Sequence, residues 1–240
     1  EADPAFDIDG IDSAHKLAVL TSLAYGCPIK YRDVFVDGIR NVSAIDILFA
    51  EELGYRIKLL AIARPTQYGI EQRVHPCMVP LDAQIAHVNG VFNAVVAEGD
   101  FVERTVFIGH GAGEGPTASA VVSDIADIAR GIVLPTFSVP VPELRILKAV
   151  PMELHNSSYY IRLSVLDQPG VIADVSALLR DESISIESLI QRARAPGEVV
   201  PVVMVTHETN EACLMRSMKK IAKLTAIQED PNIIRIEPLK

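Results

Sequence analysis

The stretch Tyr160-Ile-Arg-Leu-Ser-Val-Leu-Asp-Gln-Pro-Gly-Val-Ile-Ala173 joins an apolar run to a Pro-Gly turn and then to a second apolar run. This pattern predicts a strand over 160–165, a tight turn, and a helix over 171–181. Farther along the chain, the same signals predict a strand over 185–192, a strand over 199–206, a helix over 210–224 and a strand over 233–236. The resulting order, βαββαβ, is that of a ferredoxin-like domain.

The first part of the chain, before this domain, has the residue spacing of helices. Apolar positions three or four apart predict a helix over 11–24. Ser43 followed by Asp46 is typical of a capping box, which predicts a helix over 43–53. A proline in the first turn and a glycine after the last predict a third helix over 116–130.

Between these helices, Val- and Ile-rich runs predict strands over 58–63, 73–79, 91–97 and 105–108. We therefore predict an α+β fold, in which a mixed or antiparallel sheet with helices is followed by the ferredoxin-like domain. Repeated prolines without periodicity indicate a linker. The predicted division is a first domain over 1–135, a linker over 136–157 and a second domain over 158–240.

The composition excludes several classes of partner. The net charge is −9, so an acidic surface repels nucleic acid and anionic lipid. No apolar run reaches the roughly 18 residues of a membrane-spanning helix. The three cysteines, Cys27, Cys77 and Cys213, lie far apart, which predicts reduced thiols and a cytoplasmic protein. Because the chain opens without Met, we expect it to be part of a longer protein.

The first candidate site is the acidic opening of the chain. Glu1, Asp3, Asp7 and Asp9 precede the first helix, on which Asp12 and Lys16 are four residues apart and share one face. Carboxylates there can hold an ammonium group, and a lysine can move a proton to or from a nearby oxygen. The alternative is an exposed ion pair with a structural role only.

The second candidate is a glycine-rich turn, Gly109-His-Gly-Ala-Gly-Glu-Gly-Pro116, between a strand and a helix. Small residues there let backbone N–H groups approach a ligand. The spacing fits neither the dinucleotide fingerprint nor a P-loop, so a purely structural turn is the alternative. His75, Cys77 and His87 lack paired ligand spacing, and we predict no metal site.

The opening sixteen residues, Glu1-Ala-Asp-Pro-Ala-Phe-Asp-Ile-Asp-Gly-Ile-Asp-Ser-Ala-His-Lys16, resemble the signature of the homoserine dehydrogenases. The resemblance implies that Glu1 and Asp12 bind the amino group of L-homoserine or L-aspartate 4-semialdehyde, with Asp7 close by. It implies that Lys16 is the acid–base residue. It also implies that Gly113, with Gly111, lies against an NAD or NADP cofactor bound mainly by a domain absent from this chain. The chain alone is then expected to be inactive.

The stretch that opened this section resembles an ACT domain, in which a strand ends in Asp-x-Pro-Gly before a helix. The resemblance implies that Asp167, Gln168 and Gly170 face a small amino acid, L-threonine for this family, while Val171 and Ile172 pack below it. The alternative is a dimerisation module without a ligand. In either case a homo-oligomer, a dimer, is expected.

Two functions are therefore open. One is a part of homoserine dehydrogenase under feedback control; the other is a stand-alone amino-acid-binding module without catalysis. The second explains the C-terminal domain but leaves the acidic opening and Lys16 unexplained. Charge reversal at Asp12 discriminates between them, because only an enzyme should lose activity while its amino-acid response stays intact.

Overall fold

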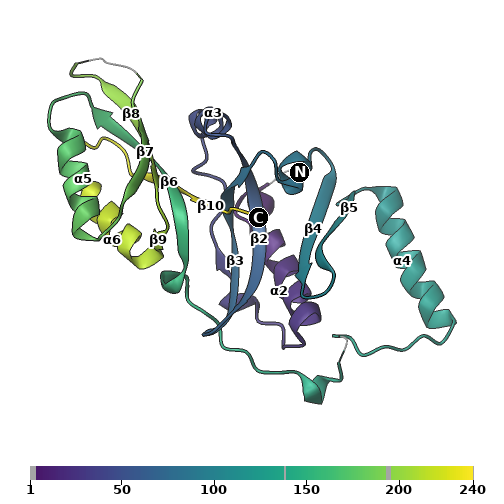
Figure 1. The fold of residues 1–240 in the computed structure, drawn as a ribbon. Helices are drawn as coiled ribbons and strands as arrows, with labels where there is room; N and C mark the ends of the chain where they lie inside the picture. Colours follow the sequence, from purple (N-terminus) through teal and green to yellow (C-terminus); the bar gives the residue numbers. More distant parts are fainter. Residues whose placement is uncertain (1–3, 138, 193–195, 240) are drawn as a thin grey trace.

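The computed structural model describes residues 4–137, 139–192 and 196–239. Two units lie side by side, joined by one continuous sheet (Figure 1). The N-terminal unit holds α1 (Ala5–Ile8), α2 (Ile11–Tyr25), β1 (Phe35–Val36), α3 (Ala44–Glu52), β2 (Tyr55–Thr66), β3 (Gly69–Pro80), β4 (Phe92–Gly99), β5 (Glu103–His110) and α4 (Glu114–Ala129). The ferredoxin-like unit holds β6 (Asn156–Leu166), α5 (Val171–Asp181), β7 (Ile186–Ile190), β8 (Val199–Thr206), β9 (Thr209–Asn210), α6 (Glu211–Ile221) and β10 (Asn232–Ile236).

The predicted helices are confirmed, because each carries its own start and stop signals. The capping box of α3 is present: the Ser43 side chain meets the backbone of Asp46, whose carboxylate accepts from the Ser43 backbone N–H. Helix α2 ends at Gly26, which adopts a left-handed conformation with φ +58°. The predicted α+β class is confirmed, and the strands of the N-terminal unit extend beyond their predicted ends.

The sheet of the ferredoxin-like unit has the strand order β10-β6-β8-β7, and its neighbours are antiparallel. Strand β10 has β6 on one side and β3 on the other. It pairs with β3 in parallel, through Arg235 opposite Cys77 and Ile236 opposite Met78. Strand β3 also pairs with β1 in parallel and with β2 in a long antiparallel hairpin. The last strand therefore joins the sheets of the two units, which the sequence pattern did not predict.

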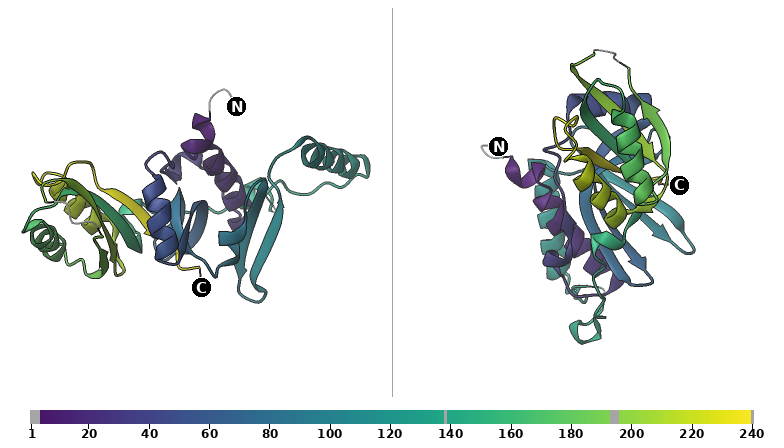
Figure 2. Two further views of the ribbon diagram at one scale, coloured as in Figure 1. Left: turned by 90° about the horizontal axis from the view of Figure 1, so that it is seen from above. Right: turned by 90° about the vertical axis from the view of Figure 1, so that its left-hand side faces the viewer.

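Both faces of the ferredoxin-like sheet are covered. One face packs against α5 and α6, in a core that includes Tyr159, Ile161 and Leu163. The opposite face carries the alternate residue Tyr160, which packs with Phe49 of α3 in a second core. Figure 2 shows α5 and α6 on the outer side of this sheet and α3 on its inner side. The N-terminal unit thus supplies a helix to the other unit.

The other end of the N-terminal unit is open. Strands β4 and β5 form a separate two-stranded sheet, joined by a turn over 100–102, and α4 stands away from the body in both figures. No residue of α4 is buried, and its Val121, Val122, Ile125 and Ile128 are 52–75% exposed.

The segment between the two units is held against the N-terminal unit. The Ile70 N–H donates to the Lys148 carbonyl at 2.8 Å, and the Val150 N–H donates to the Ile70 carbonyl at 3.0 Å. Gly69 is required there, because a Cβ atom would lie 2.1 Å from the Lys148 oxygen. Within the described residues, no helix combines the length and the apolar character needed to cross a bilayer.

Candidate functional site

Helix α2 begins at a sharp turn that orients its first residues. Gly10 has φ +76°, and a Cβ atom there would lie 3.1 Å from Val74 Cγ1. The buried face of the helix, including Ala14 and Leu17, then packs against Val34 and Val74. Since this face fixes the rotation of the helix, Asp12 and Lys16 are left on its accessible side.

The predicted pair of Asp12 and Lys16 is brought together. Lys16 Nζ lies 2.6 Å from Asp12 Oδ2, with side chains that are 58% and 35% exposed for the lysine and the aspartate. Both groups are therefore within reach of a ligand. Asp7 lies on α1, one turn before Gly10, and is exposed. Glu1 lies outside the described residues.

A loop over 37–41 is clamped onto this segment, and its role was missed from the sequence. The Ile39 N–H donates to the Ile8 carbonyl at 2.9 Å. Arg40 forms a two-point ion pair with Asp9, including Nη2 to Oδ2 at 3.0 Å. Gly38 must lack a side chain, because a Cβ atom would lie 2.5 Å from the Ile8 oxygen. The carboxylate of Asp9 and the cation of Arg40 are 31 residues apart in the sequence, so no local pattern pairs them.

The two glycines predicted to lie against the cofactor have different surroundings in the glycine-rich turn. Gly111 packs against β4, where a Cβ atom would lie 2.1 Å from the Asn93 side-chain nitrogen, and its N–H donates to the Val91 carbonyl at 2.9 Å. Gly113 is the N-cap of α4 with φ +127°, and only the Pro116 ring would lie near its Cβ. Its backbone is exposed, and Glu114 places a negative charge in the first turn of the helix, where it is stabilised by the helix dipole.

The predicted amino-acid site of the ACT-like stretch is the loop that opens α5. Gly170 is the left-handed N-cap with φ +97°, and Gln168 and Gly170 are exposed. The Asp167 backbone is fixed, since its N–H donates to the Glu198 carbonyl at 2.9 Å and its carbonyl accepts from Gly197 at 3.1 Å. Val171 and Ile172 pack against the core of the unit, below the loop.

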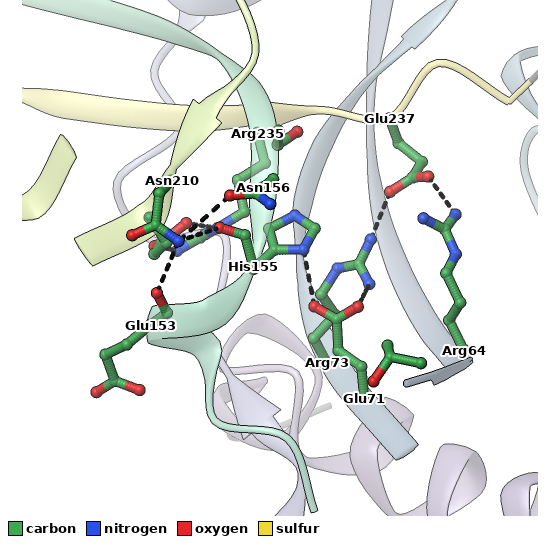
Figure 3. Close-up of polar contacts among 12 residues, drawn as sticks. Arg64, Glu71, Arg73, Glu153, His155, Asn156, Asn210, Arg235 and Glu237 are labelled. Carbon is green, nitrogen blue, oxygen red and sulfur yellow. Dashed lines mark hydrogen bonds and ion pairs between the residues drawn. The ribbon is translucent and has the colours of Figure 1, made fainter. Parts of the chain in front are cut away.

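A network of buried ion pairs joins the two units (Figure 3). Arg73 of β3 is fully buried and lies 3.0 Å from Glu71 Oε2 and 2.6 Å from Glu237 Oε2. His155, just before β6, lies 2.7 Å from Glu71. Burial raises the pKa of Glu71, but the hydrogen bond from His155 and the charge of Arg73 outweigh this effect and bring the pKa below its ordinary value. These charged side chains hold one another in place and stabilise the contact between the two units.

The His75 and Cys77 side chains of β3 are buried away from any ligand. His75 and Cys77 are both fully buried, with 3.2 Å between the sulfur and Nδ1. Burial raises the pKa of the Cys77 thiol and lowers that of His75 well below its usual value, so both stay neutral. Among the described residues, no group of three acidic, histidine or cysteine side chains could hold a metal ion, and the three cysteines are free.

Comparison with known proteins assigns a family to each unit. The family model for homoserine dehydrogenase matches residues 1–126, and that for the ACT domain matches residues 159–222. The homoserine dehydrogenases of Neisseria gonorrhoeae and Pseudomonas aeruginosa are 42% and 40% identical to this chain over 246 aligned residues. The crystal structure of a homoserine dehydrogenase from Thiobacillus denitrificans is 43% identical, with a TM-score of 0.90 over 100% of this chain.

The chain spans about half the length of the curated relatives it matches, 56% of the Neisseria protein and 57% of the Pseudomonas protein. It likewise covers 56% of the Thiobacillus structure. A homoserine dehydrogenase structure from S. aureus is more distant, at 28% identity and a TM-score of 0.70, and is covered to 56%.

Proposed function

Because this chain belongs to the homoserine dehydrogenase family, we propose that it forms the substrate-binding and regulatory part of an enzyme that interconverts L-homoserine and L-aspartate 4-semialdehyde. The observation that carries the proposal is the ion pair of Asp12 and Lys16 at the accessible start of α2. NAD or NADP is the proposed redox partner, bound mainly by a part of the protein that this chain does not span. We call this chain together with that part the complete enzyme.

The proposed binding mode uses the acidic start of the chain. Asp12 holds the ammonium group of the substrate, and Asp7 and Glu1 are the proposed further ligands of that group. Asp12 is paired with Lys16 in the structure, so a bound ammonium gives this carboxylate a second cationic partner. Lys16 Nζ is then available to the oxygen at the reacting carbon.

The proposed chemistry divides the work between cofactor and protein. When bound, the nicotinamide accepts or supplies the hydride at C4 of the substrate. In the oxidation direction Lys16 acts as the neutral amine and takes the hydroxyl proton, and in the reduction direction it acts as the ammonium and returns that proton, which is the work of a positioned acid–base residue. The exposed backbone at Gly113 fits the edge of a flat cofactor ring, and Gly111 supports that turn by packing on Asn93.

The test is a comparison of two preparations. The complete enzyme is expected to reduce aspartate semialdehyde with NAD(P)H, whereas this 240-residue chain alone is expected to show no turnover. Nicotinamide absorbance reports the reaction, and comparing NADH with NADPH settles the cofactor. A complete enzyme that folds and binds the cofactor but does not turn over homoserine would favour the sensor function instead.

We further propose that the ACT domain binds L-threonine at the loop over 167–170. An N-terminus of an eleven-residue helix attracts a carboxylate, and Gln168 and Gly170 are accessible. The expected result of calorimetric titration is saturable binding of threonine, with L-homoserine as the comparison ligand. Asp167→Ala is expected to weaken it by about tenfold, a loss of roughly 1.4 kcal/mol.

Asp181→Asn, at the other end of α5, is the matched control and should bind threonine as the wild type does. Unchanged affinity in Asp167→Ala would place the effector elsewhere. No threonine binding at all would leave the ACT domain as an assembly module.

We propose that the protein is a homo-oligomer, a dimer in the simplest case. The exposed apolar residues on α4 and on the hairpin of β4 and β5 support burial against further protein.

A further inference from the structure

The loop over 37–41 lies between the candidate substrate site and the ACT domain. Toward the site it is clamped onto Ile8 and Asp9, at the turn that leads into α2. It is also fixed to β3, because the Asp37 N–H donates to the Val74 carbonyl at 2.8 Å. A displacement of this loop therefore moves the turn before Asp12.

On its other side the loop faces the ACT domain. Arg235 of β10 lies 3.7 Å from the Asp37 carboxylate, measured from Nη1 to Oδ2. Its guanidinium carbon lies 5.1 Å from the centre of the Phe35 ring, on the strand that runs into the loop. Arg235 is thus in contact with two residues that determine where the loop begins.

Arg235 is itself held from within the ACT domain. Its Nε donates to Glu211 Oε2 at 3.0 Å, and its Nη2 donates to the other carboxylate oxygen. Glu211 stands in the first turn of α6 and also accepts from the Tyr159 hydroxyl at 2.7 Å. The guanidinium side chain is 7% exposed and Glu211 5%, so neither group has freedom to relax without its partner.

The packing around this contact is incomplete, which makes the ion pair more important. A cleft of about 160 Å³ separates Asp37, Gly38 and Asn41 from Met215, Asn232 and Arg235. Asp37 and Arg235 both line this cleft, so their ion pair links the loop to the ACT domain across it, in addition to the backbone hydrogen bond that fixes the loop to β3. The planar fork of arginine can serve Glu211 and Asp37 together, which a lysine cannot do.

Resting on the function proposed above, we propose that Arg235 is a positioning residue for the substrate site, coupling Glu211 of the ACT domain through Asp37 to the loop over 37–41. It touches neither substrate nor cofactor. Its effect reaches Asp12 and Lys16 through the contacts of Gly38, Ile39 and Arg40 with the turn before α2.

The test uses Asp37→Asn, Arg235→Lys and Arg235→Met in the complete enzyme. Asp37→Asn keeps the shape and leaves the pair of Arg235 with Glu211 intact, so it should fold. All three variants are expected to raise KM for L-homoserine about tenfold, which is less than the roughly 10²-fold cost of a full 1 Å misplacement of reacting groups, because the loop acts on Asp12 only through the turn before α2. KM for the nicotinamide cofactor should stay unchanged, and Arg235→Lys should not restore the wild-type value.

Arg216→Met is the matched control, because Arg216 on α6 pairs with the carboxylate of Glu182 and does not face the loop. An unchanged KM for homoserine in Asp37→Asn, or a loss shared equally by Arg216→Met, would overturn the proposal.

A second readout does not depend on activity. Hydrogen exchange of the Asp37 and Ile39 amides, which donate to Val74 and Ile8, is expected to accelerate in Asp37→Asn and not in Arg216→Met. If the wild type fails to oxidise homoserine, the proposed function fails, and hydrogen exchange alone decides whether the loop is positioned as inferred. Equal exchange in the wild type and Asp37→Asn would refute it.

Discussion

Replacing Lys16 with Met in the complete enzyme is expected to lower kcat for homoserine oxidation by about 10²–10⁴-fold, the usual contribution of a positioned general base. Methionine keeps a long unbranched chain but cannot accept the proton of the hydroxyl group. Asp12, the proposed ligand of the ammonium group, is unchanged in this variant, so KM for homoserine should change less than kcat. Steady-state rates at saturating cofactor measure both quantities.

Lys30→Met is the matched control for this change. Lys30 is also half-exposed and lies 3.9 Å from Asp33 in an ion pair three residues apart, but it is on a different segment. Its kcat should stay close to that of the wild type. Threonine binding by Lys16→Met should also be unchanged, which excludes a general folding defect. A kcat for Lys16→Met within about threefold of the wild type would contradict the assigned role.

Replacing Asp46 with Asn is expected to destabilise this chain by about 3–5 kcal/mol, because it breaks a buried ion pair. Asp46 is fully buried at the junction of the two units. Its carboxylate accepts from Tyr160 at 2.9 Å, from Arg162 Nε at 2.7 Å and from Asn232 at 2.9 Å. The amide of asparagine leaves the Arg162 guanidinium with the exposed Glu229 carboxylate, 3.9 Å from its Nη1, in place of the buried one. Urea unfolding measures the loss of free energy.

The effect of Asp46 should also depend on pH. Burial alone would raise its pKa, but the hydrogen bonds from Arg162, Ser43 and Tyr160 together hold the pKa below the ordinary value. A carboxylate with a lowered folded-state pKa stabilises the fold fully above its unfolded pKa of about 3.9, and this contribution is lost as the pH falls through the folded value. The difference between the wild type and Asp46→Asn should therefore narrow below about pH 4.

Asp181→Asn provides the control for stability, because Asp181 pairs with Arg180 on the surface and is 51% exposed. Asp181→Asn should lower the free energy of unfolding by less than about 0.5 kcal/mol. A loss below about 1 kcal/mol for Asp46→Asn would show that the carboxylate does not hold the units together.

The helices and the order of the C-terminal unit could be predicted because their signals are local. Helix α3 carries its capping box at Ser43 and Asp46, and Gly26 ends α2 with a left-handed residue. The pairing of Asp12 with Lys16 follows from helical spacing alone. In each case the deciding residues lie within one or two turns of one another.

The rest depends on residues far apart in the sequence. Asp46 appears locally as a helix cap, yet it also binds Tyr160 and Arg162, which follow it by 114 and 116 positions. Nothing near β10 indicates that its free edge pairs with β3. The sequence around Gly111 does not indicate that a Cβ atom there would lie 2.1 Å from the side-chain nitrogen of Asn93 on β4. Such contacts depend on how distant elements pack, which periodicity does not describe.

The pairing of β10 with both β3 and β6 has a consequence for biosynthesis. Strand β10 leaves the ribosome after the other strands of this sheet. Until then, the edges of β3 and β6 that pair with it are unpaired. Unpaired edges are templates for intermolecular association. A nascent chain arrested before residue 232 should therefore need protection by a chaperone, and release of the last strand should close both halves in one event.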